Sequence, residues 1–134
     1  MGGDLPALVV VDAANVMGSV PDGWWRDRSG AAGRVRDALS GVAAAGLPGV
    51  VDPPAEVVLV TEGAARDVPG TPAVRVVAAR GSGDDAIVDL VRSAEPGTRR
   101  VVVVTADREL RARVRALGAE VTGPRSVYPP PGHD

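Results

Sequence analysis

The stretch ALVVVDAAN, residues 7–15, decides the fold that we expect, because an unbroken apolar run leads directly into an aspartate and an asparagine. Runs that are apolar throughout are typical of strands buried on both faces, as in a parallel sheet covered by helices. Similar short valine-rich runs recur along the chain. They predict five strands, at Ala7–Val11, Val57–Val60, Val74–Val77, Val101–Val104 and Glu120–Thr122.

Apolar residues at helical spacing predict helices between these strands, around Gly30–Ala45, Asp84–Ala94 and Asp107–Leu117, with Gly118 as the C-cap of the last. Residues 18–30 are expected to form a long loop. The alternation predicts an α/β three-layer sandwich, with a mainly parallel five-stranded sheet and helices on both faces. The strands at residues 7–11 and 101–104 should be neighbours at its centre.

The chain has 134 residues, the size of one ordinary domain. We find no internal repeat and expect a single domain over residues 1–127. Residues 128–134 contain three consecutive prolines, and we expect them to form an extended tail.

Composition removes several kinds of chemistry. The sequence has no cysteine, all 15 of its basic residues are arginine, and its one histidine is His133, beside the C-terminus. This excludes cysteine nucleophiles, thiolate metal sites and any phosphate loop that needs lysine. The net charge of −2 gives no reason to expect a general electrostatic clamp on nucleic acid. Carboxylates, Asn, Ser, Thr and Arg remain for catalysis.

The apolar runs are too short to span a bilayer, and no charged segment followed by an apolar one opens the chain. We therefore expect a soluble cytoplasmic protein that makes no contact with a membrane. The oligomeric state stays open, with a homodimer as one option.

Acidic residues follow three of the predicted strands. Ligands of an open parallel sheet bind beyond the carboxyl ends of its strands, so residues at those ends are informative. Asp12 follows the first strand, the pair Asp84 and Asp85 follows the third, and Asp107 follows the fourth. Glu62 follows the second strand and is expected further out.

Carboxylates gathered without basic partners repel one another unless they are protonated or bridged by a cation. Oxygen ligands without His or Cys suit Mg²⁺ or Mn²⁺, and such a site supports hydrolysis of a phosphodiester by metal-activated water. Each acid taken alone also suits a helix N-terminus, which is a purely structural role. Asp89, one helical turn after Asp85, is a further candidate ligand or a solvated residue.

In their order and spacing, VVDAANV at residues 10–16, Gly83-Asp84-Asp85 and VTAD at residues 104–107 resemble the NYN group of the PIN-like nuclease superfamily. The resemblance implies a small α/β domain whose carboxylate pocket binds a divalent metal and cuts RNA. It implies catalytic roles for Asp12, Asn15, Asp85 and Asp107, and metal ligation by Asp12, Asp85 and Asp107, with Asp84 as an adjacent candidate beside Asp89, which helical spacing suggests. Glu109 stands where the family often has a second Asp, and Arg80 is the one nearby base for the family's basic position.

Trp24 and Trp25 are adjacent aromatic residues in a chain that has no phenylalanine, and Arg26 follows them. They could stack on unpaired bases, with arginines on the phosphates. Alternatively, one tryptophan packs the start of the first long helix over the sheet. Together with Thr105 and Arg80, these three residues are the candidates for substrate binding.

Three functions remain open on the sequence alone. The first is a metal-dependent ribonuclease that cleaves single-stranded RNA. The second is a non-catalytic PIN-like module that binds RNA or a protein. The third is a phosphohydrolase acting on nucleotides with the same metals.

Overall fold

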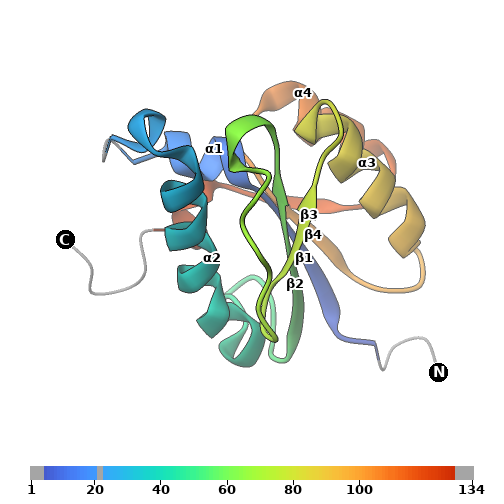
Figure 1. Ribbon diagram of the computed structural model, residues 1–134. Helices are drawn as coiled ribbons and strands as arrows, with labels where there is room; N and C mark the ends of the chain where they lie inside the picture. Colours follow the sequence, from blue (N-terminus) through green and yellow to red (C-terminus); the bar gives the residue numbers. More distant parts are fainter. Residues whose placement is uncertain (1–4, 21–22, 129–134) are drawn as a thin grey trace.

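The computed structural model describes residues 5–20 and 23–128, in which five parallel strands form one sheet (Figure 1). The strand order is β3-β2-β1-β4-β5, so β1 and β4 are central neighbours as predicted. The strands are β1 Ala7–Asp12, β2 Ala55–Thr61, β3 Arg75–Ala78, β4 Val101–Val104 and β5 Glu120–Thr122.

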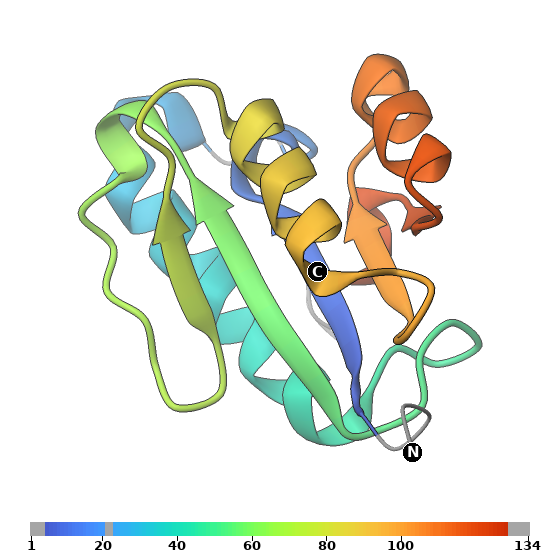
Figure 2. The ribbon, with the colours of Figure 1, turned by 90° about the vertical axis from the view of Figure 1, so that its right-hand side faces the viewer.

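Helices cover both faces of this sheet and make the predicted three layers. Figure 1 shows α2 on one side and α3 and α4 on the other, and Figure 2 shows α3 and α4 in front of the sheet with α2 behind it. The helices are α1 Ala13–Gly18, α2 Arg28–Ala45, α3 Gly83–Ala94 and α4 Arg108–Ala116, with short 3-10 turns η2 Trp24–Arg26, η3 Gly63–Ala65 and η4 Pro124–Ser126.

The core is double because side chains of a strand alternate between the two faces. In β1, Val9 and Val11 pack with Leu39 of α2, whereas Val10 packs with Ile87 of α3 on the opposite face. All five side chains are fully buried. This explains the unbroken apolar runs: central strands covered on both faces need apolar residues at every position.

The segment after β1 differs from the prediction, which placed a turn and then a long loop over residues 18–30. A short helix, α1, follows β1 directly, because the Asp12 side chain caps it by accepting a hydrogen bond from the backbone N–H of Asn15. Within residues 18–30, the turn η2 interrupts the predicted loop, and α2 already begins at Arg28. A six-residue helix presents too little apolar periodicity to be found from spacing.

The helix boundaries otherwise follow local chemistry. Asp27, Ser82 and Asp107 cap α2, α3 and α4 with their side chains. Gly46, at φ 71°, ends α2, and a Cβ there would collide with the carbonyl oxygen of Val51. Gly118, at φ 98°, follows the end of α4 as predicted.

The predicted tail begins too early. Tyr128 is only 7% exposed and packs in the core on the α2 face, because η4 turns the chain back onto the domain. The proline-rich remainder, residues 129–134, lies outside the described residues. Within the described part of the chain, no helix is both long enough and apolar enough to cross a membrane.

Candidate active site

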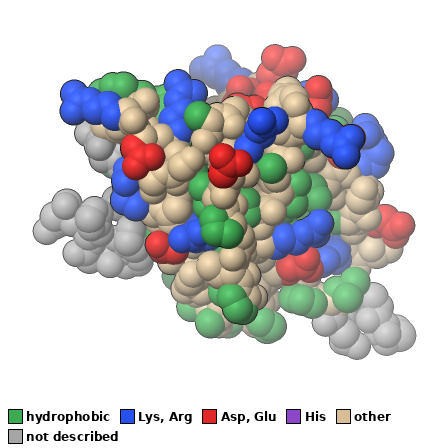
Figure 3. All heavy atoms as spheres, in the orientation of Figure 1, with side chains coloured by type: hydrophobic (Ala, Val, Ile, Leu, Met, Phe, Trp, Pro, Cys, Tyr) green, Lys and Arg blue, Asp and Glu red, His purple; other side chains and the backbone are tan. Residues whose placement is uncertain are grey.

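The candidate site lies at the carboxyl edge of the sheet, where α1, α3 and α4 all begin. Their N-terminal N–H groups and helix dipoles make this edge favourable for anions. Figure 3, in the orientation of Figure 1, shows acidic side chains at the upper edge of the molecule with arginines on either side, and no broad field of one charge on this face. The edge is therefore locally acidic rather than a basic track for nucleic acid.

Asp12 is the most buried carboxylate of the site, at 7% exposure. One oxygen accepts a hydrogen bond from the backbone N–H of Asn15 at 3.3 Å, and the other accepts one from the Thr105 hydroxyl at 3.0 Å. Burial, with smaller contributions from the nearby charges of Asp84 and Glu62, raises the pKa of Asp12 to about 6 despite these two hydrogen bonds. Burial is thus the main cause of the shift, and crowding of like charges contributes less.

Hydrogen bonds connect the end of β1 to the start of α4. The Thr105 hydroxyl also accepts from the backbone N–H of Asp107 at 3.1 Å, and the Asn15 side chain accepts from the backbone N–H of Ala106 at 2.8 Å. Asp107 in turn caps α4 by accepting from Leu110 at 2.9 Å. The sequence-predicted residues Asp12, Asn15, Thr105 and Asp107 are therefore brought together.

Asp84 and Asp85 point to different surroundings although they are adjacent at the start of α3. Burial, together with the charges of Asp107 and Glu62, raises the pKa of Asp84, which places its carboxylate among the acids of the site. Asp85 instead forms an ion pair with Arg113 of α4 at 3.0 Å, and its side chain is 70% exposed. Of the two aspartates, Asp84 is therefore the one whose charge acts on Asp12.

Two further predicted residues lie apart from Asp12. Asp89 is solvent-exposed and pairs with Arg92 at 3.4 Å on the same helix. Asp89 and Arg80 line a separate hollow of about 450 Å³, together with Asp85. Asp12 does not line this hollow.

Glu62 belongs to the site, although the sequence placed it further out. Its carboxylate accepts a hydrogen bond from the backbone N–H of Gly83, the first residue of α3, and its charge raises the pKa of both Asp12 and Asp84. The extent of β2 was the feature that could have located Glu62. Asp12 is paired with Val60, and β2 continues one residue further, to Thr61, so Glu62 follows directly at the same edge of the sheet. Asp12, Glu62, Asp84 and Asp107 are called the acidic cluster below.

The two tryptophans have different surroundings. Trp24 is partly buried and packs against the core on the α2 face, which matches the alternative of a structural tryptophan. Trp25 is 54% exposed, meets Trp24 edge to face, and has the Arg26 guanidinium 5.7 Å from its ring centre. The Arg28 guanidinium lies 5.4 Å from the ring centre of Trp24.

The oxygen donors of the acidic cluster suit Mg²⁺ or Mn²⁺ in kind. Among residues 5–20 and 23–128, however, no three His, Cys, Asp or Glu side chains are close enough together to hold a metal ion as they stand. Mg²⁺ is commonly held by one or two carboxylates, with water and substrate phosphates completing its shell. The cluster fits this sparse kind of site and does not fit an all-protein cage.

Comparisons with known proteins report on the fold. No protein-family model matches the sequence, and no curated protein matches it. Among solved structures, the chain is similar to Rae1 (YacP) from Bacillus subtilis, with a TM-score of 0.70, and to a mutant form of the same protein, with a TM-score of 0.63. Each alignment covers 89% of this chain and 70% of the other at 16% identity. The three-layer α/β fold of this chain is therefore one that those structures share.

Proposed function

We propose that this protein is a ribonuclease that cleaves single-stranded RNA at the acidic cluster with the help of Mg²⁺ or Mn²⁺. The fold agrees with the NYN resemblance of the sequence motifs, and the cluster lies where ligands of parallel α/β sheets bind. Residues from four separate segments of the chain meet there.

The observation that carries the proposal is the burial of an ionisable group at Asp12. Its structural task is to cap α1, and serine or asparagine would perform that task without placing a carboxylate in a desolvated position. The raised pKa shows that the carboxylate is held at a cost to folding. A cation bound beside it would offset that cost, which supports a functional reason for the negative charge.

The chain's own groups define how a substrate would be held. Asn15 uses its side-chain oxygen to accept from Ala106, which fixes the amide and leaves its NH₂ group as the donor for a phosphate oxygen. The Thr105 hydroxyl holds the Asp12 carboxylate in one orientation. The first turns of α1 and α4 direct their N–H groups toward the same edge.

Asp12 and Asp84 are the carboxylates that would hold the metal ion, and Glu62 and Asp107 are the other acids of the cluster. When bound, the ion lowers the pKa of water and neutralises charge on the phosphoryl oxygens. The carboxylates cannot replace that contribution, since they are anions facing an anionic substrate. The described residues include no Lys, Cys or His that could supply it.

The decisive experiment incubates labelled single-stranded RNA with the protein in Mn²⁺, in Mg²⁺ and in excess chelator. Cleavage should require the metal, and the Asp12→Asn protein should lose at least ~10²-fold in rate, because each charged ligand supports several kcal/mol of transition-state stabilisation through the ion. The matched control is Asp37→Asn, an exposed carboxylate on α2 that pairs with Arg36. Cleavage that persists in chelator, or at the wild-type rate with Asp12→Asn, would overturn the mechanism.

A second candidate function is binding without cleavage. It is favoured by the absence, within the described residues, of a preassembled three-ligand metal group. A binding module would retain single-stranded RNA in chelator and would leave it intact in Mn²⁺. Binding and cleavage measured on the same labelled RNA separate the two functions.

A further inference from the structure

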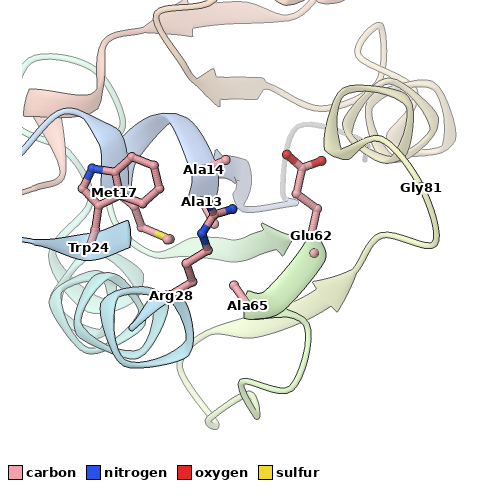
Figure 4. Close-up of a pocket in the computed structure, with 9 residues that line it drawn as sticks. Ala13, Ala14, Met17, Trp24, Arg28, Glu62, Ala65 and Gly81 are labelled. Atoms are coloured by element: carbon pink, nitrogen blue, oxygen red, sulfur yellow. The ribbon is translucent and has the colours of Figure 1, made fainter. Parts of the chain in front are cut away.

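A pocket of about 310 Å³ adjoins the acidic cluster and shares Glu62 with it. Figure 4 shows Trp24, Met17 and Arg28 on one side of this pocket and Glu62 on the other, with Ala13 and Ala14 between them. The sequence motifs do not account for this pocket, because it draws residues from α1, η2, α2 and the turn after β2.

The lining combines apolar walls with a cation and an anion. Trp24, Met17 and the alanines supply flat or apolar surface, and Gly63 and Gly81 complete the lining without side chains. The Arg28 guanidinium lies over the Trp24 ring, so it is held as a plane of N–H donors beside an aromatic surface. Planar recognition of this kind suits a nucleobase, which offers a flat face and hydrogen-bonding edges.

Arg28 and Glu62 on opposite sides favour one base among the four. Arginine pairs with two adjacent acceptors, and guanine offers O6 and N7 in that arrangement. Guanine also carries the N1 and N2 donors on its other edge, which a carboxylate can accept. Glu62 retains acceptor capacity for them, since the bond from Gly83 uses one of its oxygens. Adenine lacks the paired acceptors, and the pyrimidines are smaller.

We propose that this pocket binds the base of a nucleotide next to the phosphate held at the acidic cluster, and that it prefers guanine. The proposal rests on the proposed function, because it assumes that RNA is the ligand. Trp24 supplies the aromatic wall on which Arg28 is held, Arg28 reads O6 and N7, and Glu62 accepts from N1 and N2. The substrate is then single-stranded RNA with guanine beside the cut, because a paired base would not be free to enter.

Binding of mononucleotides tests the pocket without any cleavage, so its outcome is independent of metal catalysis. The chain has two tryptophans, which give two indole N–H signals in a nitrogen–proton correlation spectrum, and Trp25→Phe assigns them. GMP, AMP, CMP and UMP are titrated in turn at constant ionic strength in the presence of chelator. All four carry the same phosphate, so differences between them report on the base.

We expect GMP to shift the Trp24 signal saturably, with a dissociation constant at least about tenfold lower than that of the other three. Arg28→Ala should abolish this preference, and Arg28→Lys should weaken it, because lysine lacks the planar fork. Arg115→Ala, which removes an exposed arginine on α4, is the matched control and should bind like the wild type. Glu62→Gln should reduce the preference while keeping an oxygen for Gly83.

Three results would overturn the inference. If no nucleotide moves the Trp24 signal, the pocket does not bind bases. If all four nucleotides bind equally, or if Arg28→Ala keeps the preference for GMP, Arg28 does not read guanine. Loss of cleavage with intact GMP binding would instead contradict the proposed ribonuclease and leave the pocket standing.

Discussion

The Thr105 hydroxyl donates to the Asp12 carboxylate at 3.0 Å, across the central pair of strands. Val11 of β1 and Val104 of β4 are paired in register. The next residue of each segment, Asp12 and Thr105, therefore lies where the two strands end. The same hydroxyl accepts from the backbone N–H of Asp107. One buried threonine therefore orients the carboxylate of the site and fastens it to the start of α4.

The first prediction concerns Thr105→Val, which keeps the shape of the side chain and removes its hydroxyl. Asp12 loses a donor that favours its charged form, so its pKa should rise further above about 6 in the metal-free protein. The backbone N–H of Asp107 also loses its acceptor, and the free energy of unfolding should fall by about 1–3 kcal/mol. Carboxyl carbon shifts followed by NMR against pH measure the first effect, and urea unfolding measures the second.

Thr105→Ser is the matched control for that substitution, because it keeps the hydroxyl and removes a methyl group. Its Asp12 pKa should stay close to that of the wild type. An unchanged Asp12 pKa in Thr105→Val would show that the hydroxyl does not stabilise the carboxylate.

The second prediction is a pH-dependent gain of stability in Asp12→Asn. The pKa of Asp12 is 3.8 in the unfolded chain and about 6 in the folded protein, so the raised value makes ionisation unfavourable to folding. Well below pH 3.8 the carboxyl is protonated in both states and contributes no difference. Between about pH 4 and 6 the unfolded state ionises first, and wild-type stability falls toward a plateau about 2–3 kcal/mol lower.

Asp12→Asn cannot ionise and should escape this loss. Metal-free urea unfolding of both proteins at pH 4 and pH 7 measures the difference, which should be larger at pH 7. Equal stability of the two proteins at both pH values would show that burial imposes no cost on Asp12.

The third prediction is that Mn²⁺ raises the melting temperature of the wild type and not that of Asp12→Asn. A ligand that binds only the folded state stabilises it by about 2.7 kcal/mol at a hundred times its dissociation constant. Thermal unfolding with increasing Mn²⁺ measures this directly. Asp37→Asn controls for loss of charge on the surface, and an equal rise in Asp12→Asn would place the ion elsewhere.

Much of the fold could be predicted from the sequence, because valine runs and helical spacing report burial directly. The parallel sheet, its central pair β1 and β4 and the three longer helices were all expected. The short helix α1 was missed, since one capping aspartate and six residues leave almost no periodic signal. The burial of Tyr128 was missed because the prolines after it predict an extended chain.

The candidate site was predictable in its place and less so in its members. Topology alone brings the residues after β1 and β4 together, so Asp12, Asn15, Thr105 and Asp107 followed from strand ends. Which of two adjacent aspartates faces the cluster depends on the rotation of α3, and that is fixed by packing and by Arg113. Glu62 depends on how far β2 extends beyond its apolar run.

The last prediction separates Asp84 from Asp85 by the same substitution at consecutive positions. Asp84→Asn removes a charge that acts on Asp12, so it should lower the pKa of Asp12 and slow metal-dependent cleavage. Asp85→Asn removes an exposed ion pair with Arg113, which contributes less than about 1 kcal/mol to stability. Cleavage rates at saturating Mn²⁺, with the Asp12 pKa measured in both metal-free variants, compare the two. Because Asp84 neighbours Asp107 and Glu62 while Asp85 faces α4, Asp84→Asn should have the larger effect on both quantities. A larger loss in Asp85→Asn would mean that α3 turns when substrate binds, and would return Asp85 to the position predicted from the sequence.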